Sequence, residues 1–312
     1  QPPDVTQPGR VTLGAKKLYE IIRDLDDSRV RISTDSDSRV RVEAERTRFS
    51  LLSISPEEYP SLPSAEGVEF LPIEASLLRE MIDRTFYAVS SDETRYNLNG
   101  IFVEITDEGA LCFVATHGHR LAKVERSAHA LPEAFAKGVI VPRKGVVEIR
   151  KLCDETDAKV EIAIHDGFLL TRRPGLLLSC RLIDGEFPAY RQVLPHNQQI
   201  RLITDRERLL HAIRRVSLVA SERGSGFAFV LDQDDMQLSA SNPDLGEAHE
   251  RLPIEYSGPR FETRYDARYF MDALQATPSK EVMIELIDDL SPAQFRPTDD
   301  PDQLAVIMPM RL

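Results

Sequence analysis

Residues 139–195 read VIVPRKGVVEIRKLCDETDAKVEIAIHDGFLLTRRPGLLLSCRLIDGEFPAYRQVLP, and two similar stretches, residues 11–63 and 260–312, occur elsewhere in the chain. Each stretch opens with a short apolar run and ends in alternating apolar and polar segments, which predict strands. Between them lie about ten residues whose apolar positions have helical spacing. These positions are Leu18, Ile21, Ile22 and Leu25 in the first stretch, Val146, Val147, Ile149 and Leu152 in the second, and Tyr269, Phe270, Ala273 and Leu274 in the third. The chain therefore contains three copies of one helix-and-strand unit.

A second repeat lies between these copies. Residues 73–126 align with residues 204–252 around the pairs Leu77-Leu78 and Leu209-Leu210. Each has an amphipathic helix followed by alternating segments, so a complete domain consists of one copy of each repeat.

The order of the two repeats predicts three domains. The first domain lacks the repeat that opens the other two, so we expect the first half of that domain to be missing from the chain. The predicted bounds are residues 1–66 for the partial first domain, 67–195 for the middle domain and 196–312 for the C-terminal domain.

The composition is that of a folded protein from a reducing compartment. Apolar residues make up 42% and charged residues 29% of the chain, which are ordinary globular values. The sequence has no run of 18 apolar residues that would suit a membrane-spanning helix. Cys112, Cys153 and Cys180 lack paired spacing, which argues against a disulfide scaffold or a zinc knuckle. We expect a cytoplasmic protein that does not contact a membrane.

Charge is distributed unevenly between the predicted helices and the rest of the chain. The net charge is −12, whereas the five predicted helices together carry +4, which leaves −16 for strands and loops. If the helices share one face, that face attracts a polyanion and the remaining surface repels it. The alternative is that these helix surfaces are merely rich in Lys and Arg. The helices are predicted over residues 14–25, 74–90, 142–152, 205–220 and 266–276.

One polar loop and the terminal strand are candidates for binding. Arg95 and Tyr96 offer a cation and an aromatic ring together, a combination that grips phosphates and stacks on bases. Met308 and Met310 lie in the terminal strand. Flexible thioethers there suit partners of varied shape, although such a strand is also commonly core.

A basic strip and an acidic segment at opposite ends of the chain favour head-to-tail pairing of two copies. Arg46 and Arg48 are predicted on one face of a strand with Phe49 and Leu51 close by, which suits an edge contact or an ordinary amphipathic strand. The acidic segment offers three carboxylates, on Asp244, Glu247 and Glu250.

An enzyme is a competing hypothesis, for example a metal hydrolase that uses His117 and His119 with Asp92 or Glu93. Two His separated by one residue need further ligands, and no nearby Cys or carboxylate completes that geometry. The sequence also has no P-loop, GxSxG, HExxH or paired-Cys motif. Gly118, between the two His, instead favours a tight turn. We therefore predict no catalytic residue, no metal site and no cofactor.

Four motifs resemble the bacterial β sliding clamp, the processivity subunit of the replicative DNA polymerase III holoenzyme. They are DETRYNLNG from residue 92, VATHGHRLA from residue 114, IVPRKGV from residue 140 and VIMPMRL from residue 306. The likeness covers essentially the whole chain and preserves the order of the motifs. It implies an α+β fold of repeated DNA-clamp domains, each with two helices packed on antiparallel β-sheets. It also implies a head-to-tail dimeric ring around duplex DNA that tethers the polymerase without catalysing a reaction.

The resemblance further implies a peptide-binding pocket where the middle and C-terminal domains meet. Its ligands would be short linear segments of the polymerase catalytic subunit, the clamp loader, and repair and translesion polymerases. The first subsite would consist of Leu98, Thr116, Gly118, His119, Arg120, Leu121, Pro188, Val193, Val306 and Met308. The adjoining subsite would consist of Arg95, Tyr269, Leu290, Pro292, Pro309 and Met310. Asn97 departs from the family pattern, because the resembled sequences can carry a second Tyr there.

Two further sets of residues follow from the resemblance. Contacts with DNA, without sequence specificity, are expected from Arg95, Tyr96, Arg143, Lys144, Arg214 and Arg215. The dimer interface is expected from Arg46, Arg48, Phe49, Leu51, Leu218, Val219, Glu247 and Glu250. A monomeric peptide-binding scaffold stays open as an alternative, because the chain is expected to lack part of its first domain.

Overall fold

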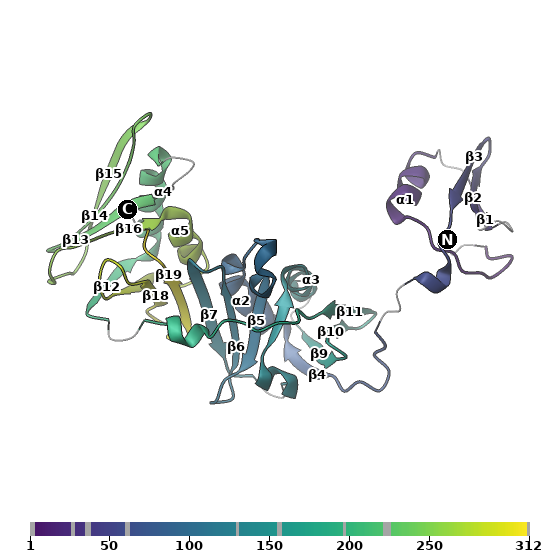
Figure 1. Cartoon of the computed structure of the whole chain (residues 1–312), viewed down its shortest axis with the longest axis horizontal. Helices are drawn as coiled ribbons and strands as arrows, with labels where there is room; N and C mark the ends of the chain where they lie inside the picture. The colour runs from purple at the N-terminus through teal and green to yellow at the C-terminus, as the bar shows by residue number, and fades with distance from the viewer. Residues whose placement is uncertain are drawn as a thin grey trace. The chain divides into compact units, whose positions relative to one another are not determined.

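The computed structural model describes residues 4–25, 29–34, 39–59, 63–128, 131–154, 158–195, 198–220 and 226–310 of the chain. They form two units, Gln1–Ser64 and Ala65–Leu312 (Figure 1). No helix within these described ranges has the length and apolar character needed to cross a membrane.

The first unit contains one helix and a three-stranded antiparallel sheet. Its elements are α1 (Ala15–Arg23), β1 (Val30–Thr34), β2 (Arg39–Ala44), β3 (Thr47–Leu52) and the short 3₁₀ helix η1 (Pro56–Glu58), with sheet order β1-β2-β3. Val40, Val42 and Ala44 alternate along β2 and are buried, as the period of a half-buried strand requires. The described part of this unit therefore holds the helix-and-strand repeat predicted for it.

The second unit contains two successive modules, each with both repeats. The first module contains β4 (Leu71–Glu74), α2 (Ala75–Thr85), η2 (Phe86–Ala88), η3 (Glu93–Leu98), β5 (Gly100–Ile105), β6 (Leu111–Thr116), β7 (Arg120–Arg126), η4 (Glu133–Lys137), β8 (Val139–Pro142), α3 (Arg143–Asp154), β9 (Lys159–His165), β10 (Phe168–Arg173), β11 (Leu176–Arg181) and η5 (Tyr190–Val193). The second contains β12 (Ile200–Asp205), α4 (Arg206–Val216), η6 (Ser217–Val219), β13 (Gly226–Asp232), β14 (Asp235–Asn242), β15 (Gly246–Pro253), β16 (Phe261–Asp266), α5 (Ala267–Gln275), β17 (Glu281–Leu286), β18 (Ala293–Pro297) and β19 (Gln303–Ile307).

Three antiparallel sheets connect these elements. Two have four strands, in the orders β11-β10-β9-β4 and β15-β14-β13-β16. The third has eight strands in the order β12-β17-β18-β19-β7-β6-β5-β8, so it runs through both modules. The modules join where β19 pairs with β7, with Val306 opposite Leu121 and Ala305 opposite Ala122.

The helices begin where a side chain caps them or where a strand ends. Asp205 accepts a hydrogen bond from the backbone N of Arg208 at 2.9 Å, and Asp266 accepts one from that of Arg268 at 2.8 Å, so both carboxylates cap helix N-termini. The predicted helix over residues 74–90 ends early, at Thr85, and continues as the 3₁₀ turn η2.

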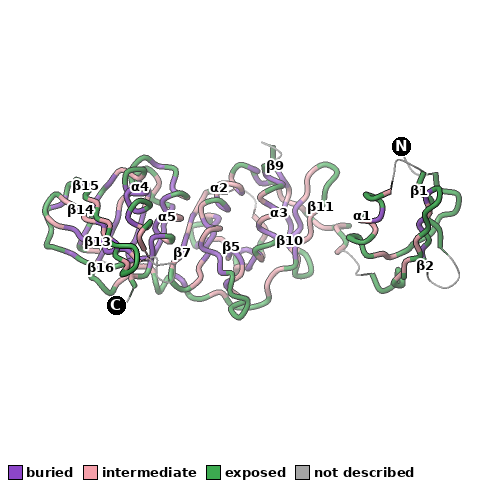
Figure 2. The backbone as a smooth tube through the Cα atoms, turned by 90° about the horizontal axis from the view of Figure 1, so that it is seen from above, coloured by how far each residue is buried: buried purple, intermediate pink, exposed green. Residues whose placement is uncertain are grey.

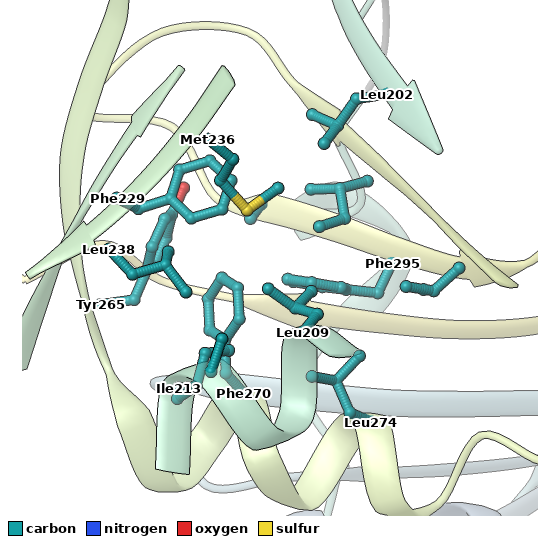
Figure 3. Packing of buried hydrophobic residues seen from close by; sticks show 14 of the residues in the cluster. Leu202, Leu209, Ile213, Phe229, Met236, Leu238, Tyr265, Phe270, Leu274 and Phe295 are labelled. Atoms are coloured by element: carbon teal, nitrogen blue, oxygen red, sulfur yellow. The ribbon is translucent and has the colours of Figure 1, made fainter. Parts of the chain in front are cut away.

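Each module has its own apolar core. In the second module, aromatic rings from sheets and helix meet: Phe270 of α5 lies 4.7 Å from Tyr265 and 4.6 Å from Phe295, between ring centroids. Figure 3 shows these rings with Leu209 and Ile213 of α4 beside them. Burial of large aromatic side chains supplies much of the hydrophobic stabilisation of such a core.

The eight-stranded sheet has two distinct faces. Ala115, Ala122 and Ala305 point to the side where both helix pairs pack, which we call the helix face. Leu121 and Val306, one residue along from Ala122 and Ala305, point to the opposite side and belong to a separate cluster. Because Ala305 lies opposite Ala122 across the seam, the helices of both modules cover the same face. They follow one another in the order α4, α5, α2, α3 (Figure 1 and Figure 2).

Candidate functional site

The turn between β6 and β7 is built around Gly118. Gly118 has φ of 96°, a backbone conformation that favours glycine. Its backbone N donates to the Thr116 hydroxyl at 3.1 Å, and that hydroxyl donates to the Arg120 carbonyl at 2.7 Å. The tight turn predicted for the VATHGHRLA motif is therefore confirmed.

The seam between β7 and β19 gathers part of the predicted pocket. The backbone N of Met308 donates to the His119 carbonyl at 2.9 Å, just beyond the Val306–Leu121 pair. Leu121 and Val306 are buried, whereas Met308 is 38% exposed. The terminal strand ends at Ile307, so Met308 and Met310 follow the strand and do not lie in it as predicted.

The segment from Asp184 to Pro195, which we call the connector, links the two modules and packs on the face opposite the helices; we call this the connector face. Its Tyr190 belongs to the same buried cluster as Leu121 and Val306. Pro188 and Val193 of the predicted pocket are exposed on the connector.

Arg120 and Tyr269 lie on the helix face instead. The Arg120 guanidinium lies 4.8 Å from the centroid of the Tyr269 ring and 5.3 Å from that of Tyr87. It also pairs with Asp272 at 2.5 Å and donates to the Tyr87 carbonyl. The structure therefore separates these two predicted pocket residues from Leu121 and Val306 by the thickness of the sheet.

His117 joins this group, although it was not among the predicted pocket residues. Its ring centroid lies 4.9 Å from that of Tyr269, and its carbonyl accepts a hydrogen bond from Arg95 at 3.4 Å. Burial, together with the neighbouring Arg120 charge, lowers the pKa of His117 to about 4. Within the described residues no group of three or more His, Cys, Asp or Glu could hold a metal ion.

Residues predicted for the second subsite gather near β16. The backbone N of Met310 donates to the Arg264 carbonyl at 2.8 Å, and the Thr263 hydroxyl donates to the Asp289 carbonyl at 3.1 Å. Leu290, next to Asp289, is 72% exposed. Three other predicted pocket residues lie in partly or largely buried positions: Leu98 at the end of η3, Pro292 before β18 and Pro309 after β19.

Three of the predicted DNA-binding residues come together at the start of α3. Tyr96, Arg143 and Lys144 line one cavity of about 680 Å³, with Glu93 and Glu148 also on its walls. Arg95 is directed elsewhere, toward Asp92 at 3.7 Å and the His117 carbonyl.

The two predicted DNA-binding residues on α4 differ in their partners. Arg215 makes a two-point ion pair with Glu250 of β15, and this pair lowers the pKa of Glu250. Arg214 is exposed and has no ion-pair partner among the residues that the structure describes. Glu250, predicted for the dimer interface, is thus already engaged within its own chain.

The predicted interface residues lie at two sheet edges. In the first unit, the prediction that Arg46 and Arg48 share one face of a strand is wrong. Glu45 and Arg46 form the turn between β2 and β3, and Glu45 has φ of 37°. Arg48 lies on β3, where it pairs across the hairpin with Glu43 at 2.5 Å, while Phe49 and Leu51 point to the other face.

The corresponding edge in the second unit is β15. Glu247 lies near its start and pairs with His249 at 3.3 Å. Leu218 and Val219 form part of η6, which packs against β14 and β15, and Leu218 is 76% exposed. Exposed apolar side chains beside an edge strand are typical of an interaction surface.

Comparison with known proteins places these features in one family. The sequence profiles of the DNA polymerase III beta subunit match the chain in three parts: the N-terminal domain over residues 2–63, the central domain over 72–189 and the C-terminal domain over 191–311. The chain belongs to the DNA polymerase III beta subunit family.

Individual members of the family resemble the chain along nearly all of its length. The beta sliding clamp of Pseudomonas aeruginosa is 32% identical over 309 residues, which cover 99% of this chain and 84% of that relative. The crystal structure of the DNA polymerase III beta subunit from Pseudomonas aeruginosa superposes with a TM-score of 0.85 at 32% identity, covering 98% of this chain and 84% of that chain. A sliding clamp from Bartonella birtlesii bound to griselimycin superposes with a TM-score of 0.84 at 33% identity, covering 98% and 83% of the two chains.

The family match corrects one expectation. Because the N-terminal-domain profile matches residues 2–63, the prediction that the first half of the first domain is missing is not supported. Each of the two later domains contains both types of repeat, which is why the sequence alone predicts a missing repeat in the first; the family match assigns residues 2–63 to the N-terminal domain.

Proposed function

We propose that this chain works as a DNA sliding clamp, which encircles duplex DNA and tethers the replicative polymerase to it without catalysing a reaction. The observation that carries the proposal is the seam between β7 and β19. It joins two modules in one sheet and keeps four helices on a single face. Membership of the beta subunit family supports the same role.

The contacts with DNA are proposed to come from the cations already named. Contacts with phosphates carry no sequence information, so they hold a duplex weakly and let the protein slide along it. We expect Arg214 to contribute more than Arg215, because Glu250 neutralises Arg215. The net charge of −12 repels DNA from the rest of the surface. The proposed set is Arg95, Tyr96, Arg143, Lys144, Arg214 and Arg215.

The ring is proposed to close as a head-to-tail homodimer. The seam within the chain supplies the template: β19 ends a helix-and-strand repeat and pairs with β7, which ends the other type of repeat. β3 and β15 hold the same places in their repeats, and each is an edge strand of its described sheet. Pairing β3 of one copy with β15 of another would bring the basic hairpin to the acidic edge.

The pocket at the seam is proposed to bind short linear peptides with apolar ends. Leu121 and Val306 offer an apolar floor, and Pro188, Val193 and Met308 offer exposed walls. Such peptides bind by placing a few anchors in preformed apolar pockets. The proposed partners are the polymerase catalytic subunit, the clamp loader, and repair and translesion polymerases.

Two further features belong to the proposal. The domain bounds are residues 1–66, 67–195 and 196–312. The location is cytoplasmic, which is supported by the role of the family in DNA replication.

The test is topological. The full chain is loaded by a clamp loader onto nicked circular DNA, washed with increasing salt and compared with the same DNA after linearisation. We expect retention on the circle at salt concentrations that release the protein from linear DNA, because a closed ring is held by topology and not by phosphate contacts. Equal release from both forms would contradict the proposed function.

A further inference from the structure

The connector is fixed to the sheet by a buried tyrosine. Tyr190 is 3% exposed, and its ring centroid lies 6.4 Å from that of Phe102 on β5. Phe102 in turn stacks on Phe187 of the connector at 4.8 Å, with the two rings nearly parallel. Rings from β5 and the connector therefore interlock on the connector face.

A buried carboxylate completes this attachment. Glu104 lies on β5, is 8% exposed, and accepts a hydrogen bond from the Tyr190 hydroxyl at 2.5 Å. The same oxygen pairs with the Arg191 guanidinium at 2.6 Å. A carboxylate at such a site is costly unless charged or polar donors satisfy it, and here both named donors come from the connector. Glu104 thus joins β5 to two consecutive connector residues.

A second attachment holds the start of the connector. The Asn97 side-chain amide donates to the Glu186 carbonyl at 2.9 Å. Asn97 belongs to η3, which also carries Arg95 and Leu98, two residues of the pocket predicted from the sequence. The residue that departs from the family pattern thus ties two pocket segments together.

The attached turn carries pocket residues. η5 spans Tyr190–Val193, so the bonds to Tyr190 and Arg191 lie within three residues of Val193 and of Pro188. Because Val193 is 57% exposed, its own burial does little to fix it. The bonds to Glu104 are the attachments nearest to Val193 in sequence among those described above, so they help to hold this wall in place.

We propose that Glu104 is a positioning residue for the peptide pocket, which holds the connector wall of Pro188 and Val193 in its binding conformation before a peptide arrives. This inference rests on the proposed function of that pocket. Because the wall is already ordered, peptide binding does not incur the entropic cost of ordering the connector. The attachment therefore raises the affinity for the peptide without contacting it.

The experiment removes the hydroxyl and keeps the ring. In the full chain, Tyr190→Phe is compared with Tyr256→Phe, a matched control. Tyr256 is also buried, belongs to the core of the other module and donates its hydroxyl to the Pro259 carbonyl at 2.7 Å. Affinity for a fluorescent polymerase-tail peptide, the thermal midpoint and hydrogen exchange of the connector amides are measured for both variants.

We expect Tyr190→Phe to weaken peptide binding on the order of three- to tenfold and to speed exchange at residues 191–193. Tyr256→Phe should lower the thermal midpoint comparably and leave the affinity unchanged. Glu104→Gln keeps an acceptor for Tyr190 and should retain most of the affinity. Unchanged affinity and unchanged exchange in Tyr190→Phe combined with Arg191→Ala, which together remove both donors to Glu104, would overturn the role of Glu104.

A third variant separates the two proposals. Met308→Ala with Met310→Ala alters the pocket itself. If it weakens binding while Tyr190→Phe does not, the pocket stands and only the positioning role fails. If the unmodified chain does not bind the peptide, the pocket and the role of Glu104 both fail.

Discussion

Gly118 shows how one residue shapes the proposed pocket. A Cβ at this position would lie 3.0 Å from Nη1 of Arg95, and the φ of 96° is strained for any L side chain. Arg95 also donates to the His117 carbonyl in the same turn. The turn and the guanidinium therefore depend on each other.

Gly118→Ala should destabilise the chain by about 1–3 kcal/mol, because it combines backbone strain with displacement of Arg95. Gly109→Ala is the control: Gly109 has φ of 83°, but nothing lies within 4 Å of its added Cβ. Denaturant unfolding should show a loss in both variants and a larger one for Gly118→Ala. Equal losses would show that the contact with Arg95 has no energetic consequence.

Glycine marks the turn that the sequence predicted, and a turn without glycine was missed. Gly118 predicted the turn between β6 and β7, and that prediction is confirmed. The two-residue turn at Glu45 and Arg46 has neither Gly nor Asn, the usual residues for positive φ in a hairpin. The sequence pattern therefore predicts a strand face for Arg46, which in the structure lies in the turn. Its charge is prominent in the sequence, but its backbone conformation is decided by the pairing of β2 with β3.

An ion-pair network joins α2 and β7 to the β18–β19 turn. Asp300 pairs with both Arg84 and Arg126, and Glu80 of α2 lies 3.0 Å from Arg84 and 2.9 Å from Arg126. The side chains of Arg84, Arg126 and Asp300 are at most 20% exposed, so these charges are largely removed from water. The network lies close to the seam and links the two modules through side chains.

Asp300→Asn should destabilise the chain by about 1–3 kcal/mol, because it removes the charge of one of the two carboxylates that the partly buried Arg84 and Arg126 share. Burial alone would raise the pKa of Asp300, but hydrogen bonds from Arg126 and Arg84 outweigh it and lower the pKa below its ordinary value of 3.8. A lowered carboxyl pKa contributes stability above the unfolded pKa, and that stability is lost as pH falls through the folded pKa. Denaturant midpoints measured from pH 6 to pH 3 should fall more steeply for the unmodified chain than for Asp300→Asn.

The control for this network is an exposed pair on one sheet. Arg172 and Glu161 pair at 2.7 Å within the β9–β10 hairpin, and both side chains are more than 40% exposed. Solvent screens such pairs, so Glu161→Gln should change stability less than Asp300→Asn. A loss as large as that of Asp300→Asn would mean that burial does not set the strength of the network.

The existence of the helices was predictable, but their ends were not. The spacing of the apolar residues predicted which faces of α2 and α4 are buried. Both helices then tighten into 3₁₀ turns, η2 and η6, that the helical period does not distinguish from a continuing helix. Two predicted starts, residues 205 and 266, lie one residue before the observed ones, because Asp205 and Asp266 are the capping residues that directly precede the helices.

The three-part repeat was visible in the sequence, whereas the continuity of the eight-stranded sheet was not. The β7–β19 pair joins strands almost two hundred positions apart, and no local pattern specifies such a partner. The pleat of the sheet separates the two groups of predicted pocket residues, and the sequence motif does not show this separation. Arg120 and Leu121 are adjacent in sequence, but the pleat places them on opposite faces.

The proposed ring can be tested by charge reversal, because the contact between β3 of one copy and β15 of another would pair opposite charges. Arg46→Glu with Arg48→Glu should shift the full chain toward monomer in sedimentation velocity, since like charges would then meet at the β3–β15 edge. Glu247→Arg in a second variant should do the same. Glu247 is the better choice over Glu250, because Glu250 holds Arg215 in its own chain.

Mixing the two variants creates one edge in which both charges are exchanged and complementary, so mixed dimers should form where neither variant forms one alone. Arg172→Glu, remote from both edges in sequence and sheet, should stay dimeric and shows that added negative charge is not itself the cause. A mixture that remains monomeric would leave charge pairing at this edge without support. Unaltered dimers in the Arg46 and Arg48 variant would place the contact between copies elsewhere.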